Sequence, residues 1–224
     1  DEYSVAYSDN INAGTATVTL TSKDKSFSTA NTKTATFKIV AKALTADMVA
    51  DIAAQAYTGS PLTPAVTVTD GDAILVVGED YAVSYADNVN VGVNTATATV
   101  TGKGNYSGSV VKTFSISAVF ANVTNAPEAL DPTYSGSAQN LVTSGEADYG
   151  TVVYSLTENG EYSETIPQAT DAGSYTVYYK ATGDSNHSES AVASVSATIA
   201  KADLSTVTVG DIADQTFNGA EIKP

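Results

Sequence analysis

The sequence predicts an all-β chain in which two-sheet antiparallel β-sandwiches follow one another end to end. Short runs rich in β-branched and aromatic residues recur along its 224 residues, and they favour strands because such side chains pack well on a pleated surface. Turn residues separate these runs about every 8 to 12 positions, a spacing typical of sandwiches. The same motifs also return about 80 residues apart, so one module is expected to repeat.

Three pairs of motifs mark the repeat. The copies in each pair keep aromatic, asparagine or glycine positions, at offsets of about 80 residues or twice that. The chain is therefore expected to contain about two and three-quarter copies of one module. The pairs are NYSGS at 105–109 with NHSES at 186–190, YTGSPLTP at 57–64 with FNGAEIKP at 217–224, and EDYAVSYADNVNVG at 79–92 with DEYSVAYSDNINAG at 1–14.

The repeat divides the chain into four predicted segments. Two complete modules are expected at residues 42–118 and 119–200, and the second is of a different subtype. Residues 1–41 are expected to form the C-terminal part of a module, and residues 201–224 the N-terminal part of another. The seams between modules lack glycine and proline, so we expect stiff connections where a Gly/Ser linker would be a flexible coil.

The first complete module shows the strand pattern most clearly. Tyr81, Val83 and Tyr85 alternate, which places them on one face of a strand. Residues 45–55 also fit a helix, but the corresponding residues 204–215 are too β-branched for one, and copies should agree. The predicted strands are residues 65–70, 81–85, 95–102 and 109–117.

The second complete module follows the same plan. Asn159 and Gly160 stand between alternating residues, and this dipeptide is a strong signal for a tight β-hairpin. The predicted strands are residues 151–157, 174–183 and 190–199.

The repeated hairpin motif predicts two local features. Gly102 and Gly183 are expected to adopt the left-handed conformation that a tight turn requires. Asn105 and Asn186 are expected to bond their own backbone two residues further on, as turn asparagines do. The motif is thus interpreted as the same hairpin in successive modules.

Composition and charge limit the possible functions. The formal net charge is −15 and every basic residue is a lysine, so neither nucleic acid nor an anionic membrane surface is an expected partner. Cysteine is absent, which excludes disulfides and thiol chemistry. No apolar run approaches 18 residues, so no membrane insertion is expected.

Four stretches carry a family resemblance: YTGSPLTPAVTVTDGD, EDYAVSYADNVNVG, TATVTGKGNYSGSVVKTFSI and DAGSYTVYYKATGDSNHSES. Together they resemble the tandem immunoglobulin-like repeats of bacterial cell-surface and secreted proteins, described as mostly bacterial Ig and related surface groups. The resemblance implies a β-sandwich used as a stalk, spacer or adhesive module, without a general catalytic site. The second copy departs from the pattern, because His187 replaces Tyr106 and Glu189 replaces Gly108.

No catalytic residue, cofactor or metal ligand is predicted. His187 is the single histidine, and we expect it to be a solvated turn residue because its counterpart is Tyr106. The sequence contains no P-loop, CxxC or HExxH pattern. We therefore expect a protein that is not an enzyme.

Calcium at module junctions stays open as a weaker alternative, because acidic turns supply the oxygen ligands that this ion prefers. The candidate groups are Asp70 with Asp72, Glu79 with Asp80, and Asp87 with Asn88 and Asn90.

Tyrosines could stack on sugars, but their recurrence at equivalent strand positions favours core or sheet packing. These recurring tyrosines are Tyr3, Tyr7, Tyr81, Tyr85, Tyr175 and Tyr179.

Two kinds of covalent modification receive little support from the sequence. An isopeptide bond between lysine and asparagine would need a buried lysine, and Lys112 and Lys180 lie in predicted strands without counterparts in the other copy. Asn105, Asn122 and Asn186 begin formal glycosylation motifs, which we interpret as incidental.

The sequence thus predicts an extracellular, non-catalytic spacer segment of a bacterial surface or secreted protein, such as an adhesin-like stalk. The alternative is a module that binds a glycan or a host protein, in some cases attached to a secreted hydrolase. The expected partners are neighbouring repeats. Residues 1–41 and 201–224 cannot each close a sandwich alone, so neighbouring chains or flanking segments are expected to complete them.

Overall fold

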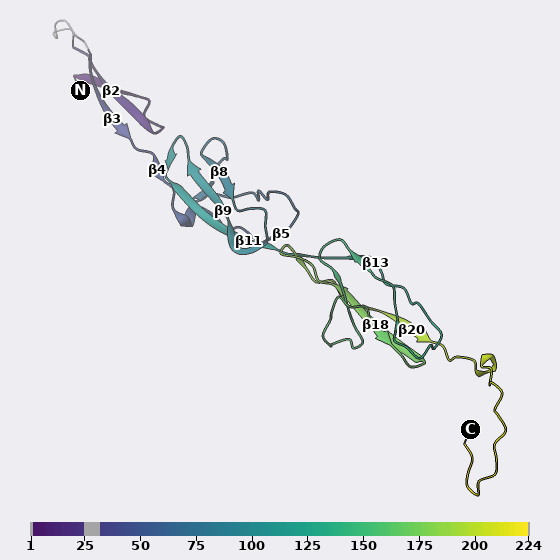
Figure 1. The fold of residues 1–224 in the computed structure, drawn as a ribbon. Helices are drawn as coiled ribbons and strands as arrows, with labels where there is room; N and C mark the ends of the chain where they lie inside the picture. The colour runs from purple at the N-terminus through teal and green to yellow at the C-terminus, as the bar shows by residue number, and fades with distance from the viewer. Residues whose placement is uncertain (1, 25–31, 224) are drawn as a thin grey trace. The chain divides into compact units, whose positions relative to one another are not determined.

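The computed structural model describes residues 2–24 and 32–223. The chain is all-β, as the sequence predicts, and two short 3-10 turns are the helical elements of the described residues. It divides into two compact units, Asp1–Val119 and Phe120–Pro224. Figure 1 labels the main strands of each unit along the chain.

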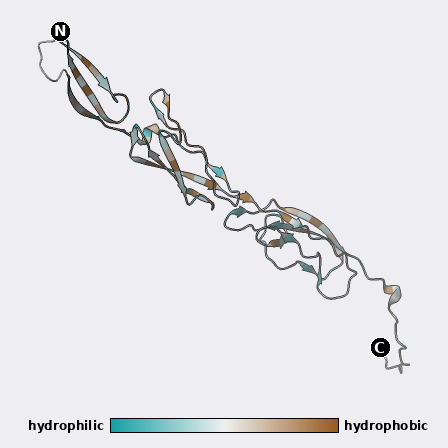
Figure 2. Ribbon diagram, turned by 90° about the horizontal axis from the view of Figure 1, so that it is seen from above, coloured by the Kyte–Doolittle hydropathy of each residue, from teal (hydrophilic) through white to brown (hydrophobic). Residues whose placement is uncertain are grey.

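The first unit begins with a three-stranded antiparallel sheet in the order β1-β2-β3. Threonine and serine alternate with apolar residues along these strands, as the banded colours of Figure 2 show, so one face is polar and the other apolar. On the apolar face, Val5 lies opposite Leu20 and Ala16 lies opposite Phe37. The strands are β1 (Tyr3–Ser8), β2 (Gly14–Ser22) and β3 (Thr32–Ile39).

A four-stranded sheet forms the body of the first unit, in the order β5-β11-β9-β8. The strands β8, β9 and β11 are antiparallel neighbours, whereas the short β5 runs parallel to β11. Two short pairs, β4 with β10 and β6 with β7, add further hydrogen bonds. The bounds are β4 (Lys42–Ala43), η1 (Ala46–Met48), β5 (Gln55–Ala56), β6 (Thr69–Asp70), β7 (Ala73–Ile74), β8 (Tyr81–Ala86), β9 (Gly92–Gly102), β10 (Tyr106–Ser107) and β11 (Ser109–Ser117).

The core of this unit lies between the four-stranded sheet and the chain segment that precedes it. Tyr81 and Val100 of the sheet are buried together with Leu44 and Val66 of that segment. Burying each such side chain contributes roughly 1.5–3 kcal/mol. The Tyr81 hydroxyl donates to the Val66 carbonyl at 2.7 Å, so the buried phenol keeps a partner. A second cluster forms around Phe114, which is also fully buried.

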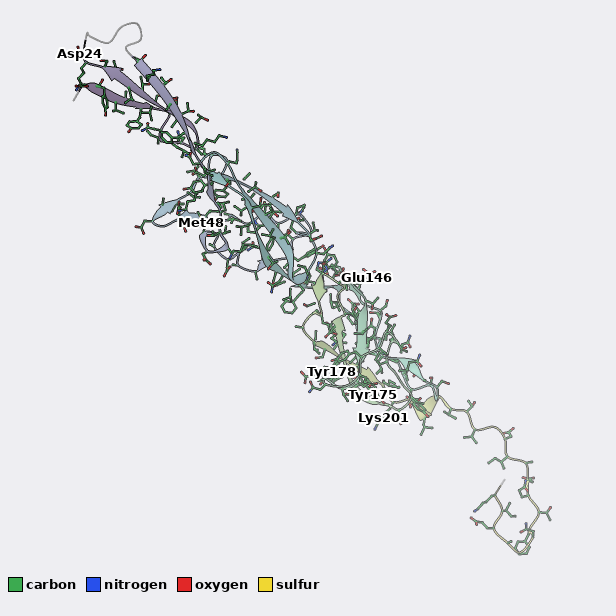
Figure 3. The ribbon with its side chains drawn as sticks, turned by 90° about the vertical axis from the view of Figure 1, so that its left-hand side faces the viewer. Asp24, Met48, Glu146, Tyr175, Tyr178 and Lys201 are labelled. Carbon is green, nitrogen blue, oxygen red and sulfur yellow. The ribbon has the colours of Figure 1, made fainter. Side chains whose placement is uncertain are left out.

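The second unit contains a three-stranded antiparallel sheet in the order β16-β18-β20. Leu141, Val177 and Ile199 are fully buried at its core, and Tyr175, labelled in Figure 3, packs against them. The short strands pair as β12 with β19, β13 with β15, and β14 with β17. The bounds are β12 (Val119–Phe120), β13 (Val123–Asn125), β14 (Gln139–Asn140), β15 (Glu146–Ala147), β16 (Val152–Ser155), β17 (Gln168–Ala169), β18 (Gly173–Ala181), β19 (His187–Ser188), β20 (Ala193–Ile199) and η2 (Leu204–Thr206).

Most of the long predicted strands are confirmed, one short strand prediction is wrong, and the disfavoured helix at 45–55 does not form beyond a single turn. The strand predicted at 65–70 shrinks to β6, because the buried residues before it belong to the packed segment and make few ladder hydrogen bonds. The possible helix at 45–55 is limited to the turn η1, where Met48 packs against the core (Figure 3). Long-range packing thus decides the conformation of this segment.

The hairpin predicted at Asn159 and Gly160 takes a different form. The chain does reverse here, since Tyr154 and Ser163 exchange two backbone hydrogen bonds of 2.8 and 3.0 Å. However, Gly160 has no positive φ, which a two-residue type I′ turn would require. Its amide donates instead to the Thr157 carbonyl at 3.1 Å, within a longer loop.

Core packing of the recurring tyrosines is confirmed in the two larger cores, to which Tyr81 and Tyr175 contribute. Tyr3 and Tyr7 pack only within the sheet, opposite Ser22 and Val18, and do not enter a core, since their exposed fractions are 56% and 59%. They lie on the apolar face of β1–β3, which is open to solvent in the described chain, so an equivalent strand position does not ensure burial.

We predict that Phe114→Ala lowers the free energy of unfolding of the first unit by about 3–5 kcal/mol, because it leaves a cavity in a closed core. Val111→Ala on the same strand is the control, since Val111 is 58% exposed and a change within about 0.5 kcal/mol is expected. Hydrogen exchange of peptides from β9 and β11 measures both. Equal losses in the two variants would contradict this description of the core.

Candidate functional site: the seam hairpins

The most distinctive site of the first unit is the hairpin tip at residues 103–108, here called the seam hairpin. Its strand β10 runs parallel to β4, and Tyr106 lies opposite Lys42. Two backbone bonds of 2.9 Å flank this pair, from the Lys42 amide to the Asn105 carbonyl and from the Leu44 amide to the Ser107 carbonyl. Because β3 ends at Ile39, the hairpin holds the chain two residues after it leaves the preceding sheet.

The side chain of Asn105 reaches in the opposite direction, to the loop between β1 and β2. Its Oδ1 accepts from the Ala13 amide at 2.7 Å, and its Nδ2 donates to the Asn12 Oδ1 at 2.9 Å. We call this pair of bonds the Asn105 clasp. The prediction that Asn105 bonds its own backbone is therefore wrong: a partner about 90 residues away uses both ends of the amide.

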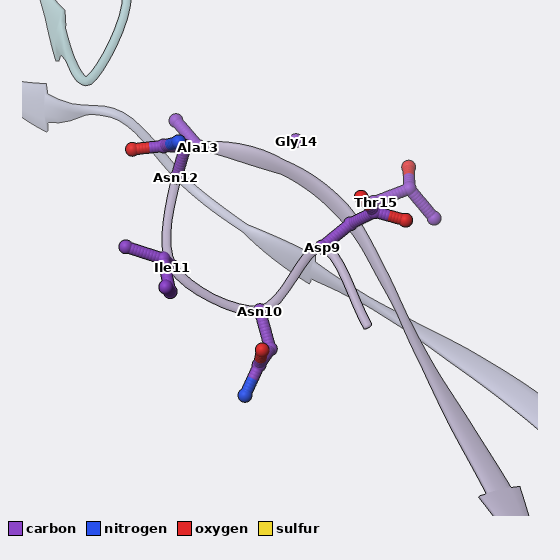
Figure 4. A pocket seen from close by; sticks show the side chains of 7 residues that line it. All are labelled: Asp9, Asn10, Ile11, Asn12, Ala13, Gly14 and Thr15. Atoms are coloured by element: carbon purple, nitrogen blue, oxygen red, sulfur yellow. The ribbon is translucent and has the colours of Figure 1, made fainter. Parts of the chain in front are cut away.

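The loop that receives the clasp surrounds an open hollow, which residues 9–15 line (Figure 4). Asn10 and Asn12 point in different directions in this view, and Asp9 lies away from both. Ile11 is 87% exposed. The polar groups do not converge on one point, so the loop offers no nucleophile with a base beside it.

Tyr106 holds the seam hairpin against the core. Its ring packs against the core, and its hydroxyl donates to the Asp70 Oδ2 at 3.2 Å. The Lys42 ammonium lies 2.5 Å from the other carboxylate oxygen. The hydrogen bond from Lys42 lowers the pKa of Asp70, and burial, aided by the bond to Asp70, raises the pKa of Tyr106. These contacts join β4, the seam hairpin and the end of β6.

The two motif glycines both lie close to the backbone of the hairpin, but they differ in conformation. Gly183 has φ of +72°, so the left-handed prediction is confirmed there. It is wrong for Gly102, which has no positive φ. A side chain at Gly102 would come within 2.6 Å of the Ser107 amide nitrogen. Glycine is therefore needed at this position for the close approach of two backbone segments.

The second unit has an equivalent backbone hydrogen bond between its entering strand and its hairpin. The Ala121 amide donates to the Ser188 carbonyl at 2.9 Å, which corresponds to the bond from Leu44 to Ser107 in the first unit. His187 takes the place of Tyr106 in the hairpin motif.

The prediction that His187 is a solvated turn residue is wrong. Its exposed fraction is 6%, and its ring stacks on Tyr149 with 3.4 Å between centroids and 8° between planes. Its Nδ1 lies 2.7 Å from the Asp184 Oδ1. A carboxylate can only accept, so this nitrogen carries the hydrogen. Like Tyr106, His187 is an aromatic anchor with a carboxylate partner.

Asp184 organises this hairpin. Its Oδ1 accepts from the backbone amides of Asn186 at 2.8 Å and His187 at 2.9 Å. The bond from the Asn186 amide, followed by that from the His187 ring, lowers the pKa of Asp184. Asp184 thus makes a turn bond of this kind itself, to the amide two residues further on, and the bond predicted for the side chain of Asn186 stays a prediction.

Three of the residues considered for calcium have partners within the chain. The Asp80 Oδ2 accepts from the Val76 amide at 2.9 Å, and the Asn88 Nδ2 donates to the Leu62 carbonyl at 2.8 Å. Asp70 is paired with Lys42, as described above. Among residues 2–24 and 32–223, no three His, Asp or Glu side chains are placed to hold a metal ion together.

The candidate lysines pair with carboxylates that face solvent. The Lys112 Nζ lies 2.7 Å from the Asp51 Oδ1, and the Lys180 Nζ lies 2.7 Å from the Glu189 Oε2. The ammonium of Lys180 also lies 4.8 Å from the centre of the Tyr162 ring. These ion pairs give no support to an isopeptide bond with asparagine.

Two of the formal glycosylation asparagines already use their side-chain amides. Asn105 forms the clasp, and the Asn122 Nδ2 donates to the Asp148 Oδ2 at 3.0 Å. The backbone amide of Asn122 also donates to Asp148, and this bond is the main cause that lowers the pKa of that carboxyl. Asn186 lies in the corresponding hairpin of the second unit.

Paired carboxylates occur in one open hollow of the second unit, which Glu146 and Glu164 help to line. Glycoside hydrolysis uses two carboxyl groups, one of them kept protonated by an apolar setting. Both side chains are exposed, and Glu164 accepts from the Thr151 hydroxyl at 3.2 Å. This arrangement does not favour acid catalysis.

Comparisons with known proteins find no matching family and no significantly similar curated protein. Within the described parts of the chain, no helix is long and apolar enough to cross a membrane.

Sequence reasoning missed two partners of the seam hairpins, Asn12 and Tyr149. Asn12 lies in the segment that resembles residues 79–92, but the pattern of that repeat carries no sign of a contact with Asn105. Tyr149 follows no alternating pattern, so only the fold shows that it stacks on His187. The repetition of the hairpin motif itself was the usable signal.

We predict that Asn105→Ala speeds hydrogen exchange at the Ala13 amide and lowers stability by about 1 kcal/mol, because both bonds of the clasp are lost. Asn10→Ala in the same loop is the matched control and should leave Ala13 unchanged. Residue-resolved exchange by NMR measures both variants. Unchanged exchange at Ala13 in Asn105→Ala would show that the clasp does not form.

We also predict that the stability of the second unit depends on pH through Asp184, and that Asp184→Asn weakens this dependence. The folded-state pKa of Asp184 is below its ordinary value of 3.8, so its contribution is present above that value and is lost as pH falls through the folded-state pKa. The stability advantage of the native chain over Asp184→Asn should therefore shrink below about pH 4. NMR signals of the second unit, followed in urea, measure it.

Asp171→Asn is the control for this pH series, because the main-chain oxygen of Asp171 accepts from Tyr175 and the change leaves that bond intact. Parallel stability curves for the native chain and Asp184→Asn would contradict the role of this carboxylate.

Proposed function

We propose that the chain is a non-catalytic structural segment of a bacterial cell-surface or secreted multidomain protein, acting as a stalk or spacer built from tandem immunoglobulin-like sandwiches. The observation that carries this proposal is the seam hairpin with its clasp. It binds the strand that leaves one sheet and, through Asn105, the loop at the end of that sheet. Such contacts resist bending at a seam, which is the property that a spacer needs.

Matching strand registers support the division into repeats at residues 1–41, 42–118, 119–200 and 201–224. In the complete repeat Tyr81 pairs with Gly102 and Val83 with Val100. In the first segment the matching strands place Tyr3 opposite Ser22 and Val5 opposite Leu20. In both strand pairs the tyrosine and the valine two positions further on face partners two positions apart on the neighbouring strand, as is expected when one module is repeated.

The backbone geometry favours a load-bearing role. Each hairpin bonds the strand that enters its module, through the Leu44 amide in one case and the Ala121 amide in the other. A pull along the chain would have to break these bonds before the core behind them opens. Resistance to forced unfolding depends on the unfolding rate, which such early-breaking bonds control.

A glycan- or host-protein-binding module is the second candidate, and one observation favours it. Two equivalent loops, residues 9–15 and 87–95, each border an open hollow with asparagine side chains. Loops at the end of a rigid sheet are where binding functions are usually found. Neither loop gathers the buried aromatic and polar groups that a strong sugar site requires.

Pulling single molecules of the chain from its two ends tests the spacer function. We predict two major unfolding events, each releasing a length on the order of 25 nm, the extended length of roughly 80 residues. Asn105→Ala should lower the force of one event and leave the other unchanged. A single event of about twice this length would overturn the division into repeats.

A glycan array probed with the same chain tests the second candidate. The spacer function predicts no saturable binding. Micromolar binding that Asn10→Ala or Asn90→Ala abolishes, without loss of stability, would favour a binding module instead.

A further inference from the structure

The strands β1–β3 present an apolar face to solvent, which we call the open face. Its side chains stand on the same side of the sheet, since Val5 lies opposite Leu20 and Tyr7 opposite Val18. Large exposed hydrophobic patches on soluble proteins are usually sites of association. The most exposed members are Tyr3 at 56%, Val5 at 46%, Tyr7 at 59%, Leu20 at 39% and Phe37 at 42%.

The residues after β20 present a second exposed set, here called the C-terminal segment, residues 204–222. Beyond the turn η2 this segment has no strand. Its large apolar side chains are solvent-exposed. They are Leu204 at 82%, Val209 at 82%, Ile212 at 62%, Phe217 at 87% and Ile222 at 37%.

The chain itself contains a packed version of this segment, 160 positions earlier. There the side chains at the same spacing belong to the two clusters of the first core, and Leu44 and Val49 are only 7% and 2% exposed. The five counterparts are Leu44, Val49, Ile52, Tyr57 and Leu62.

The sheet that receives the packed segment corresponds to the open face. Tyr81 is 4% exposed and Phe114 is 1% exposed, whereas their counterparts Tyr3 and Phe37 are 56% and 42% exposed. Equivalent aromatic side chains are thus buried in the four-stranded sheet and exposed on the open face. The open face and the C-terminal segment are thus equivalent to the sheet and the segment that pack together in the core of the first unit.

Charge favours the same pairing. The charged residues of β1–β3 are both basic, Lys33 and Lys38, and Lys33 lies opposite Leu20 on the open face. The C-terminal segment contains Asp211, Asp214 and Glu221 and no lysine. Opposite charges at the two surfaces steer association and suppress pairing of two identical open faces.

We propose that the C-terminal segment of one copy of the chain packs on the open face of a second copy, head to tail. By analogy with β5, which runs beside β11 with Gln55 opposite Ile116, residues Gln215 and Thr216 would run parallel to β3 near Ile39. This proposal rests on the proposed function, because it assumes that the chain consists of repeated modules. Because the two contacting surfaces differ, the contact can extend into chains of molecules instead of stopping at a dimer.

Sedimentation of the full chain over a wide concentration range tests the proposal. The native chain should shift from monomer to larger species as concentration rises. The double variant Ile212→Ser with Phe217→Ser should lose this shift while both units keep their stability, because these side chains are exposed. Ile74→Ser is the matched control, since Ile74 is 73% exposed outside both surfaces, and it should associate like the native chain.

A mixing experiment tests the polarity of the contact. Chains with a blocked segment (Ile212→Ser with Phe217→Ser) keep the open face, and chains with a blocked face (Tyr7→Ser) keep the segment. Each alone should be monomeric, and their mixture should form a dimer that grows no further. Hydrogen exchange at residues 204–222 should then slow at least about tenfold in the chain with the blocked face.

A native chain that stays monomeric at all concentrations would overturn the proposal, as would protection of residues 204–222 without a rise in mass, which would indicate closure within one molecule. Association that survives the double variant would also overturn it. Each of these results leaves the two unfolding events and the exchange of Ala13 untouched, so a failure here is distinguishable from a failure of the spacer function.

Discussion

The structure of the first unit depends on the parallel backbone pairing between the strand that enters the module and the tip of a hairpin more than 60 residues later. This pairing fixes Lys42 and Leu44 beside Asn105 and Ser107. From there the following residues lie over the four-stranded sheet and close the core. Without it, the segment would have no defined starting point, because it makes few ladder bonds of its own.

The same constraint explains why two different aromatic residues occupy one position. Tyr106 and His187 both follow the asparagine of the hairpin, and each has an aspartate partner, Asp70 in one unit and Asp184 in the other. What the position requires is a flat ring that packs beneath the hairpin and a polar edge that reaches a carboxylate. A histidine in this setting has a structural role, although its isolation in the sequence invites a catalytic interpretation.

Large apolar residues are exposed where a sheet lacks its covering segment, or a segment lacks its sheet. The core of a module needs its own sheet and the segment that enters it, and neither half is stable with its apolar side in water. The described chain contains one closed core and the uncovered counterparts of its two parts, so the burial of equivalent residues can be compared within one molecule. Tyr81 and Tyr3 differ in burial only because one of them is covered.

The all-β class, the long strands β8, β9, β11, β18 and β20, and the repeated hairpin could be predicted from the sequence, because period-two alternation and turn residues are local signals. The bond between Asn105 and Asn12, the burial of His187 on Tyr149, and the exposure of Tyr3 where Tyr81 is buried depend on long-range packing. Each of these depends on a partner distant in the chain or on a covering segment. Local pattern carries no information about either, since the same residues at the same spacing fit both a covered and an uncovered sheet.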